Sequence, residues 1–92
     1  MIRVNCFFQA TEPEMFKDAL RSAVLLADKS CKHAGCVAYD VFVSTTRSDV
    51  FMICETWKDH AVLDNHTATP EFKRYVKEMT DRGLLKIEQF EF

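Results

Sequence analysis

Alternation of apolar and polar residues predicts four β-strands. In each of four segments the side chains alternate with a period of two, as expected for a strand with two different faces. These segments are residues 2–8, 36–43, 50–57 and 84–91. Bulky apolar residues occur on both faces of these strands, so we expect both faces of the resulting sheet to be covered.

A second period, near 3.6 residues, predicts the helices. The first helix is expected over residues 12–30, with Thr11 as its N-cap and Pro13 in its first turn. Its apolar stripe consists of Phe16, Ala19, Leu20, Ala23, Val24 and Ala27. A short helix is expected to begin at the cap residue Asp59 and to reach His66. A third helix is expected to start at Thr69-Pro70 and to stop at Gly83, with Phe72, Tyr75, Val76 and Met79 on its apolar face.

The order of these elements, β-α-β-β-α-β, is that of the ferredoxin-like α+β fold with an antiparallel sheet. Residues 1–92 are enough for one domain only. In this fold the helices cover one face of the sheet. Since the chain is 48% hydrophobic and carries eight Phe residues, we expect the other face to pack against a second copy, giving a dimeric α+β barrel.

Composition excludes several classes of partner. The net charge is −2 with mixed signs throughout, and no basic stripe suggests nucleic acid or an anionic membrane. No apolar run approaches a membrane span and no secretion signal is recognisable, so a cytoplasmic protein is expected. Only two glycines occur, too few for a phosphate-cradling or dinucleotide loop.

The four cysteines are expected to be reduced thiols, because no secretion signal accompanies them. Cys6 and Cys54 lie inside strand-like apolar runs and are expected to be buried. Cys31, His33 and Cys36 lie close together, but their spacing matches no zinc pattern and no second pair follows. We therefore expect no bound metal.

The richest concentration of chemically active side chains is Glu55, Trp57 and His66. Glu55 shares an apolar strand face, where a carboxylate is costly unless it is paired across the sheet or the dimer, or is a cavity acid with a raised pKa. Trp57 could be core or could wall a pocket and aim its indole N–H at a ligand. His66 at a helix end is either a partner of the helix dipole or the best general acid or base in the chain.

Two further polar residues are weaker candidates. Asn5 interrupts an apolar strand, and its amide is either satisfied within the sheet or a donor to an oxyanion on the open face. Tyr39 is either core or pocket lining. His60, at an exposed helix start, and His33, in a loop, carry less weight than His66.

The chain resembles the antibiotic biosynthesis monooxygenase family over nearly its full length. The anchors are Gly35-Cys36-Val37-Ala38-Tyr39-Asp40, Glu55-Thr56-Trp57-Lys58-Asp59, His66 and Thr69-Pro70-Glu71-Phe72-Lys73. It looks especially like the small bacterial members that act on quinols or on phosphorylated autoinducer-2. The resemblance implies a homodimer with a cavity between sheet and helices in each subunit. It also implies a substrate that is deprotonated and then reduces oxygen itself, without metal or flavin.

Carried over by position, His66, Trp57 and Glu55 would be catalytic, and Asn5 and Tyr39 would bind the substrate. The function expected from these residues is a cofactor-independent monooxygenase of a quinol or another small oxygenated compound. The alternatives are an isomerase or degrading enzyme of an autoinducer-like sugar phosphate, and a non-catalytic ligand-binding dimer. Haem degradation ranks lower, because the histidine of haem-degrading relatives lies further downstream and Asn5 matches their asparagine only loosely.

Overall fold

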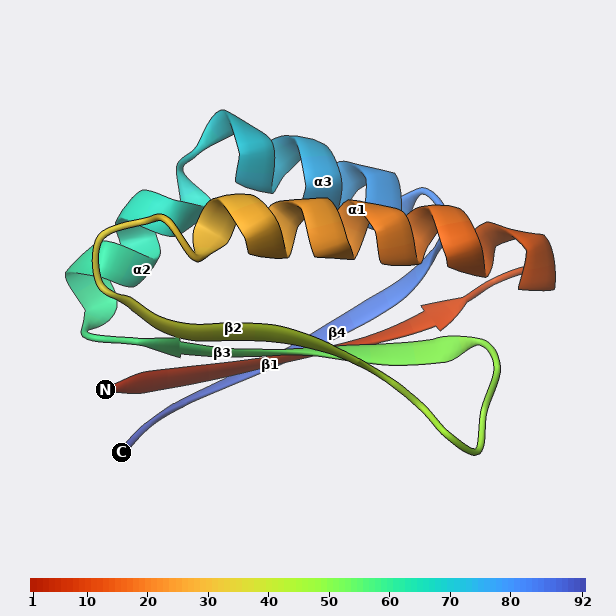
Figure 1. Cartoon of the computed structure of the whole chain (residues 1–92), viewed down its shortest axis with the longest axis horizontal. Coiled ribbons are helices and arrows are strands. Elements are labelled where there is room, and N and C mark those ends of the chain that lie inside the picture. Colours follow the sequence, from red (N-terminus) through yellow and green to blue (C-terminus); the bar gives the residue numbers. More distant parts are fainter.

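A computed structural model describes all 92 residues and has the expected ferredoxin-like α+β fold (Figure 1). Its elements are β1 (Ile2–Ala10), the 3₁₀ helix η1 (Pro13–Met15), α1 (Phe16–Ser30), β2 (Cys36–Val43), β3 (Val50–Trp57), α2 (His60–Thr67), α3 (Pro70–Thr80) and β4 (Gly83–Glu91). The four strands form one antiparallel sheet in the order β2-β3-β1-β4. All helices lie on one side of it, and both chain ends lie at one end of the sheet. No helix has the length and apolar character needed to cross a membrane.

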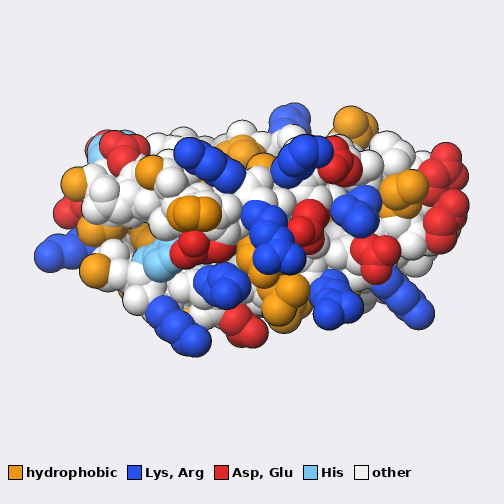
Figure 2. Space-filling model, turned by 90° about the horizontal axis from the view of Figure 1, so that it is seen from above, with side chains coloured by type: hydrophobic (Ala, Val, Ile, Leu, Met, Phe, Trp, Pro, Cys, Tyr) orange, Lys and Arg blue, Asp and Glu red, His pale blue; other side chains and the backbone are white.

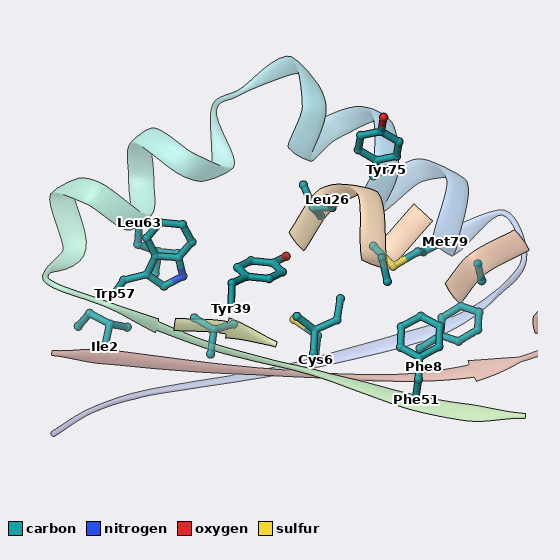
Figure 3. Packing of buried hydrophobic residues seen from close by; sticks show 14 of the residues in the cluster. Ile2, Cys6, Phe8, Leu26, Tyr39, Phe51, Trp57, Leu63, Tyr75 and Met79 are labelled. Carbon is teal, nitrogen blue, oxygen red and sulfur yellow. The ribbon is translucent and has the colours of Figure 1, made fainter. Parts of the chain in front are cut away.

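The core fills the space between the helices and one face of the sheet (Figure 3). Residues of even number in β1 and odd number in β3 point into it, among them Phe8 and Phe51, whose rings stack with centroids 4.6 Å apart. Removing one such buried ring typically costs about 3–5 kcal/mol, so this pair contributes strongly to the stability of the core. Trp57 and Leu63 pack at the other end of the core, under α2 (Figure 3).

The first helix differs from its sequence prediction in both its start and its buried face. Its first turn is the separate helix η1, Thr11 caps nothing, and the Thr11 hydroxyl donates instead to the carbonyl oxygen of Arg82. The buried positions are Ala19, Ser22, Ala23, Leu26 and Ser30, whereas Val24 is 45% exposed. The small side chains let α1 lie close to the sheet, and close approach outweighs the larger apolar area of Val24.

The caps of the two later helices are confirmed. The Asp59 carboxylate accepts from the Val62 N–H, and the Thr69 hydroxyl oxygen accepts from the Phe72 N–H. Gly83 was expected to stop α3, but the helix ends at Thr80 and Gly83 opens β4. A Cβ atom on Gly83 would lie 2.3 Å from the Gln9 carbonyl oxygen, so glycine is needed there for the close approach of β1 and β4.

The second face of the sheet has no helix over it. Its exposed apolar side chains include Phe7, Phe42, Leu84 and Phe90. Cys54 is also on this face and only half-buried, which corrects the expectation that it lies in the core. The alternation of strand residues explains the error, since the position next to the buried Glu55 must face the other way.

Candidate functional site

A cavity of about 260 Å³ opens between the sheet and the helices α2 and α3. Half of its ten lining residues are apolar and half are polar. The lining residues are Val4, Cys6, Glu55, Leu63, Asp64, His66, Thr67, Phe72, Ile87 and Gln89. Small apolar cavities with a few convergent polar groups are the usual form of ligand sites.

Glu55 lies on the cavity face of β3 and is almost fully buried. Its Oε1 accepts a 2.9 Å hydrogen bond from the indole N–H of Trp57, and its Oε2 accepts from the Cys6 thiol at 3.5 Å. Burial raises the pKa of Glu55 to about 7, although both hydrogen bonds oppose the rise. The carboxyl has no Lys or Arg partner within the chain, so the interpretation as a cavity acid with a raised pKa is the one its surroundings favour.

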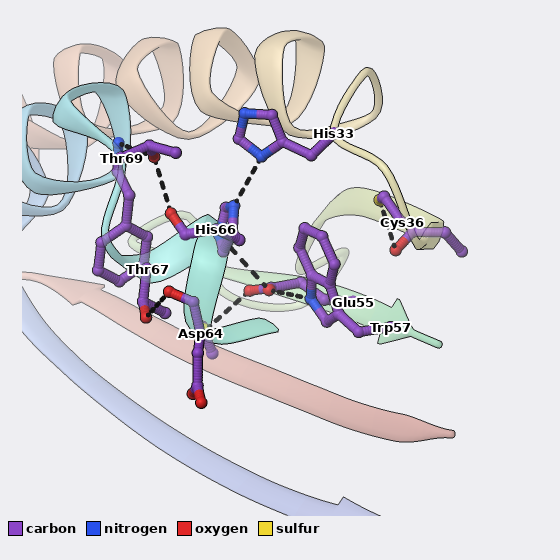
Figure 4. Close-up of polar contacts among 11 residues, drawn as sticks. His33, Cys36, Glu55, Trp57, Asp64, His66, Thr67 and Thr69 are labelled. Carbon is purple, nitrogen blue, oxygen red and sulfur yellow. Dashed lines mark hydrogen bonds and ion pairs between the residues drawn. The ribbon is translucent and has the colours of Figure 1, made fainter. Parts of the chain in front are cut away.

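His66 comes from α2 and its side chain has no exposed surface. It lies among the rings of Trp57, Phe72 and Tyr39, with centroids at 4.4, 5.1 and 5.8 Å. Burial, and after it the nearby His33, lowers the pKa of His66 to about 4. Its Nε2 lies 4.0 Å from Oε1 of Glu55 and has no hydrogen-bond partner (Figure 4). The neutral imidazole therefore offers one unsatisfied nitrogen beside the carboxyl group.

Local structure fixes α2 at both ends and so places His66. At the start, Gly35 adopts φ +83° and its carbonyl oxygen accepts from the Lys58 N–H, which ties the loop before β2 to the residues before α2. A Cβ atom on Gly35 would lie 2.5 Å from the side chain of Val62, so only glycine fits against the helix. At the end, the Thr69 hydroxyl donates to the His66 carbonyl oxygen at 2.7 Å.

The structure brings together four of the five residues expected at the site. Glu55, Trp57, His66 and Tyr39 form one buried cluster, in which Tyr39 and Trp57 support the ring of His66 without lining the cavity. Burial also raises the pKa of the Tyr39 phenol, so its hydroxyl stays neutral. Asn5 lies on the other face of the sheet, where its amide donates to Glu88 Oε1 at 3.0 Å. It does not reach the cavity.

Two contacts of the site were missed by sequence reasoning. His33, from the loop after α1, places its Nδ1 3.2 Å from Nδ1 of His66, and its Nε2 3.0 Å from Oε1 of Glu71. Cys6 faces Glu55 from the neighbouring strand. The alternation of residues along β1 could have indicated Cys6, because it places Cys6 on the same face of the sheet as Glu55 of the paired strand β3. Nothing in the sequence indicates the conformation of the loop that carries His33.

The thiols near this loop bind backbone rather than one another. The Cys31 thiol donates to the Tyr39 carbonyl oxygen and the Cys36 thiol to that of Ala38, both at 3.7 Å. No three His, Cys, Asp or Glu side chains gather in a way that could hold a metal ion.

Comparison with known proteins identifies the family. Residues 1–78 match the antibiotic biosynthesis monooxygenase family. The chain belongs to this family. YcnE of Bacillus subtilis, a proposed monooxygenase, is 31% identical over 65 residues, which cover 71% of this chain and 68% of YcnE. An uncharacterized Synechocystis protein is 26% identical over 70 residues, which cover 76% of this chain but only 48% of that longer protein.

Solved structures of similar proteins support the same assignment. A conserved Bacteroides thetaiotaomicron protein of unknown function, described as a possible oxidoreductase, is 44% identical with a TM-score of 0.95, over 99% of this chain and 96% of its own. A crystal structure of an antibiotic biosynthesis monooxygenase is 28% identical with a TM-score of 0.90, over 100% and 98% of the two chains. The family match ends within α3, and the likeness to the solved structures extends over β4 as well.

Proposed function

We propose that this chain is a cofactor-independent monooxygenase that oxidises a small quinol or similar enolisable compound in the cavity between sheet and helices. The observation that carries the proposal is the unpartnered Nε2 of His66 beside the buried Glu55 carboxyl. A buried polar atom without a partner is rare in folded proteins. A substrate hydroxyl between the two groups would satisfy it.

The reaction begins when His66 accepts the hydroxyl proton of the substrate. The O–H bond breaks, an N–H bond forms at Nε2, and an electron-rich phenolate or enolate remains. This anion passes one electron to O₂, and the radical pair closes to a C–O bond. The resulting peroxide anion takes a proton back from Nε2 of His66 and becomes a hydroperoxide. Where the attacked carbon carries hydrogen, the hydroperoxide loses water and leaves a carbonyl group. The substrate supplies all the electrons, and the second oxygen atom leaves as water.

The Glu55 carboxyl and the walls of the cavity have complementary tasks. At neutral pH the carboxyl is partly protonated, so it can donate to an oxygen of the substrate or of the peroxide. The apolar side chains of Val4, Leu63 and Phe72 exclude water, which strengthens these interactions. A volume of about 260 Å³ suits a substrate of one or two rings.

The same proposal includes a homodimer formed through the uncovered face of the sheet. That face carries exposed Phe7, Phe42, Leu84 and Phe90, with Lys86 and Glu88 among them. On the helix side, by contrast, Lys, Arg, Asp and Glu side chains are spread over the surface (Figure 2). Several large apolar side chains exposed on one face commonly mark a contact with another protein. A second copy presents an identical face, so a two-fold contact would bury both at once. The cavities lie on the helix side and remain complete in each subunit.

Oxygen uptake tests the proposal. A panel of one- and two-ring hydroquinones should give enzyme-dependent O₂ consumption, and His66→Ala should lower kcat by roughly 10²-fold or more, the usual effect of losing a general acid or base. His60→Ala is the matched control, because His60 lies at the exposed start of the same helix. Full activity of His66→Ala, or turnover of a sugar-phosphate carbonyl compound without O₂ uptake, would contradict the proposal.

A further inference from the structure

A second imidazole lies behind the site and connects it to the surface. Glu71, His33 and His66 form a continuous row. The distance between Glu71 Oε1 and His33 Nε2 is 3.0 Å. The two Nδ1 atoms of His33 and His66 lie 3.2 Å apart (Figure 4). The row begins at Glu71 on the first turn of α3 and ends at the unpartnered Nε2 of His66. Glu71 and His33 are partly exposed, so solvent reaches one end of the row only.

The chemistry of the three groups fixes where the protons lie. An ionised carboxylate only accepts hydrogen bonds, so the nitrogen of His33 that faces Glu71 must carry a proton. The other nitrogen of neutral His33 is then an acceptor, and His66 must donate to it from Nδ1. The proton of neutral His66 is thereby held at Nδ1, which leaves Nε2 bare and ready to accept a proton from the cavity.

His66 alone would be a poor base, because its imidazolium would have no access to water. Its side chain is 0% exposed, whereas that of His33 is 21% exposed and touches a carboxylate. A positive charge is therefore better accommodated on His33 than on His66. Moving the positive charge from His66 to His33 takes it away from the aromatic rings that surround His66.

We propose that His33 and Glu71 are the proton outlet of the site and set the tautomer of His66. When His66 takes a proton at Nε2, its Nδ1–H bond breaks and an N–H bond forms at Nδ1 of His33. The charge then lies on His33 beside Glu71, and His33 returns to neutrality by releasing a proton to water. In the reverse direction, a proton that arrives on His33 turns His66 into an Nε2–H donor. This inference rests on the proposed function only in taking His66 as the group that faces the substrate.

Two further ionisable groups act on the row. Glu55 of β3 lies 4.0 Å from Nε2 of His66 on the cavity side, and the charge of Lys29, near the end of α1, favours the ionised form of Glu71. The aromatic rings around His66 carry no charge near neutral pH. The pKa of Glu71 is lowered by its own backbone N–H and by the hydrogen bond from His33, which keeps this carboxylate ionised.

Nitrogen NMR tests the tautomer without any substrate. In water, neutral histidine favours the Nε2–H form, so the Nδ1–H form of His66 at pH 7.5 is a specific expectation. Long-range ¹H–¹⁵N spectra of the wild-type chain should show it. His33→Phe should return His66 to the Nε2–H form, and Glu71→Gln should give a mixture, since an amide can accept from His33 or donate to it. A wild-type Nε2–H form, or an unchanged Nδ1–H form in His33→Phe, overturns the inference.

The exposed pair of His60 and Glu91 provides the control, since it is also a histidine–carboxylate contact but lies outside the site. His60→Phe and Glu91→Gln should leave the His66 spectrum unchanged. A change there equal to that in His33→Phe would mean that the His66 tautomer does not depend on the row, and the inference would be wrong.

Kinetics separate the relay from the monooxygenase function. With an active hydroquinone, His33→Phe should lower kcat by roughly 10-fold or more while KM stays nearly constant, because His33 does not line the cavity. Glu71→Asp should recover much of the loss seen in Glu71→Gln. If His66→Ala is inactive but His33→Phe keeps its kcat and pH profile, the relay fails and the function stands. If no hydroquinone is oxidised but the tautomer responds as stated, the function fails and the row stands.

Discussion

At the scale of single residues, the site combines two groups whose proton affinities are shifted in opposite directions. The folded protein holds the Glu55 proton more tightly than the unfolded chain does, since the pKa of Glu55 rises from 4.5 to about 7. The stabilisation linked to Glu55 is thus full below about pH 4.5 and is lost as the pH rises through 7. His66 behaves in the opposite way, since its pKa falls from 6.5 to about 4 and its stabilisation is lost as the pH drops through that value.

The opposite pH dependences of these two contributions to the free energy of unfolding predict how single variants behave. In the wild-type chain the two contributions largely cancel between pH 4.5 and 6.5. In Glu55→Gln the amide oxygen can still accept from the Trp57 indole. The variant cannot ionise, so it does not lose stability as the pH rises. Its free energy of unfolding relative to wild type should therefore grow by about 3 kcal/mol between pH 4.5 and 7.5. Urea unfolding at several pH values measures this difference.

The companion variant is His66→Leu, which cannot be protonated and so does not lose stability as the pH falls. Its free energy of unfolding relative to wild type should change with the reverse sign, improving as the pH falls from 6.5 to 4. Slopes of the same sign in Glu55→Gln and His66→Leu would show that the two groups are not shifted as described.

The thiols should differ sharply in their reactivity. Cys6 is buried and its pKa is raised by burial and then by Glu55, so it should resist alkylation in the native state. Cys31 is exposed and should react first, while burial raises the pKa of Cys36 to about 11 and slows it. Mass spectrometry of timed iodoacetamide reactions reads the order, with Cys31→Ser as control. Native labelling of Cys6 at the rate of Cys31 would contradict its placement.

At the scale of elements, the position of α2 depends on one glycine. Gly35→Ala combines a left-handed backbone angle with a clash against Val62, so it should cost roughly 2 kcal/mol or more and displace the helix that carries His66. Adding Val62→Ala should recover the stability lost through the clash with Val62, but not the stability lost through the backbone angle. Thermal unfolding of both single variants and the double variant measures the coupling. Simple additivity would show that the contact does not restrain α2.

Elements with local signals were predictable, and those set by packing were not. Asp59 and Thr69 cap their helices through bonds to residues three positions on, which a sequence shows directly. The buried face of α1 depends on how closely a helix of small side chains can approach the sheet. The cluster of Glu55, Trp57 and His66 was predictable, because Glu55 and Trp57 alternate onto the same face of one strand and His66 follows on a short helix. The His33 contact depends on a loop conformation and could not be foreseen.

At the scale of the whole molecule, the proposed homodimer depends on the uncovered face of the sheet. We expect light scattering at micromolar concentration to give twice the 10.7 kDa mass of the chain. Phe42→Lys, on the edge strand β2 of this face, should shift the protein toward monomer, because it places a charge in the proposed contact. Val24→Lys, on the exposed side of α1, is the control and should leave the mass unchanged. A stable wild-type monomer would rule out the proposed dimer.

The sheet is one peptide layer thick, and this has a consequence for how the protein can diverge. Along β3 the odd-numbered residues face the core, and Glu55 among them lines the cavity, whereas even-numbered residues such as Cys54 face the open side. A substitution at Glu55 alters the cavity, while a substitution at Cys54 alters the outer surface. Selection can therefore change the interior and the outer surface of the sheet separately, within the same eight residues of chain.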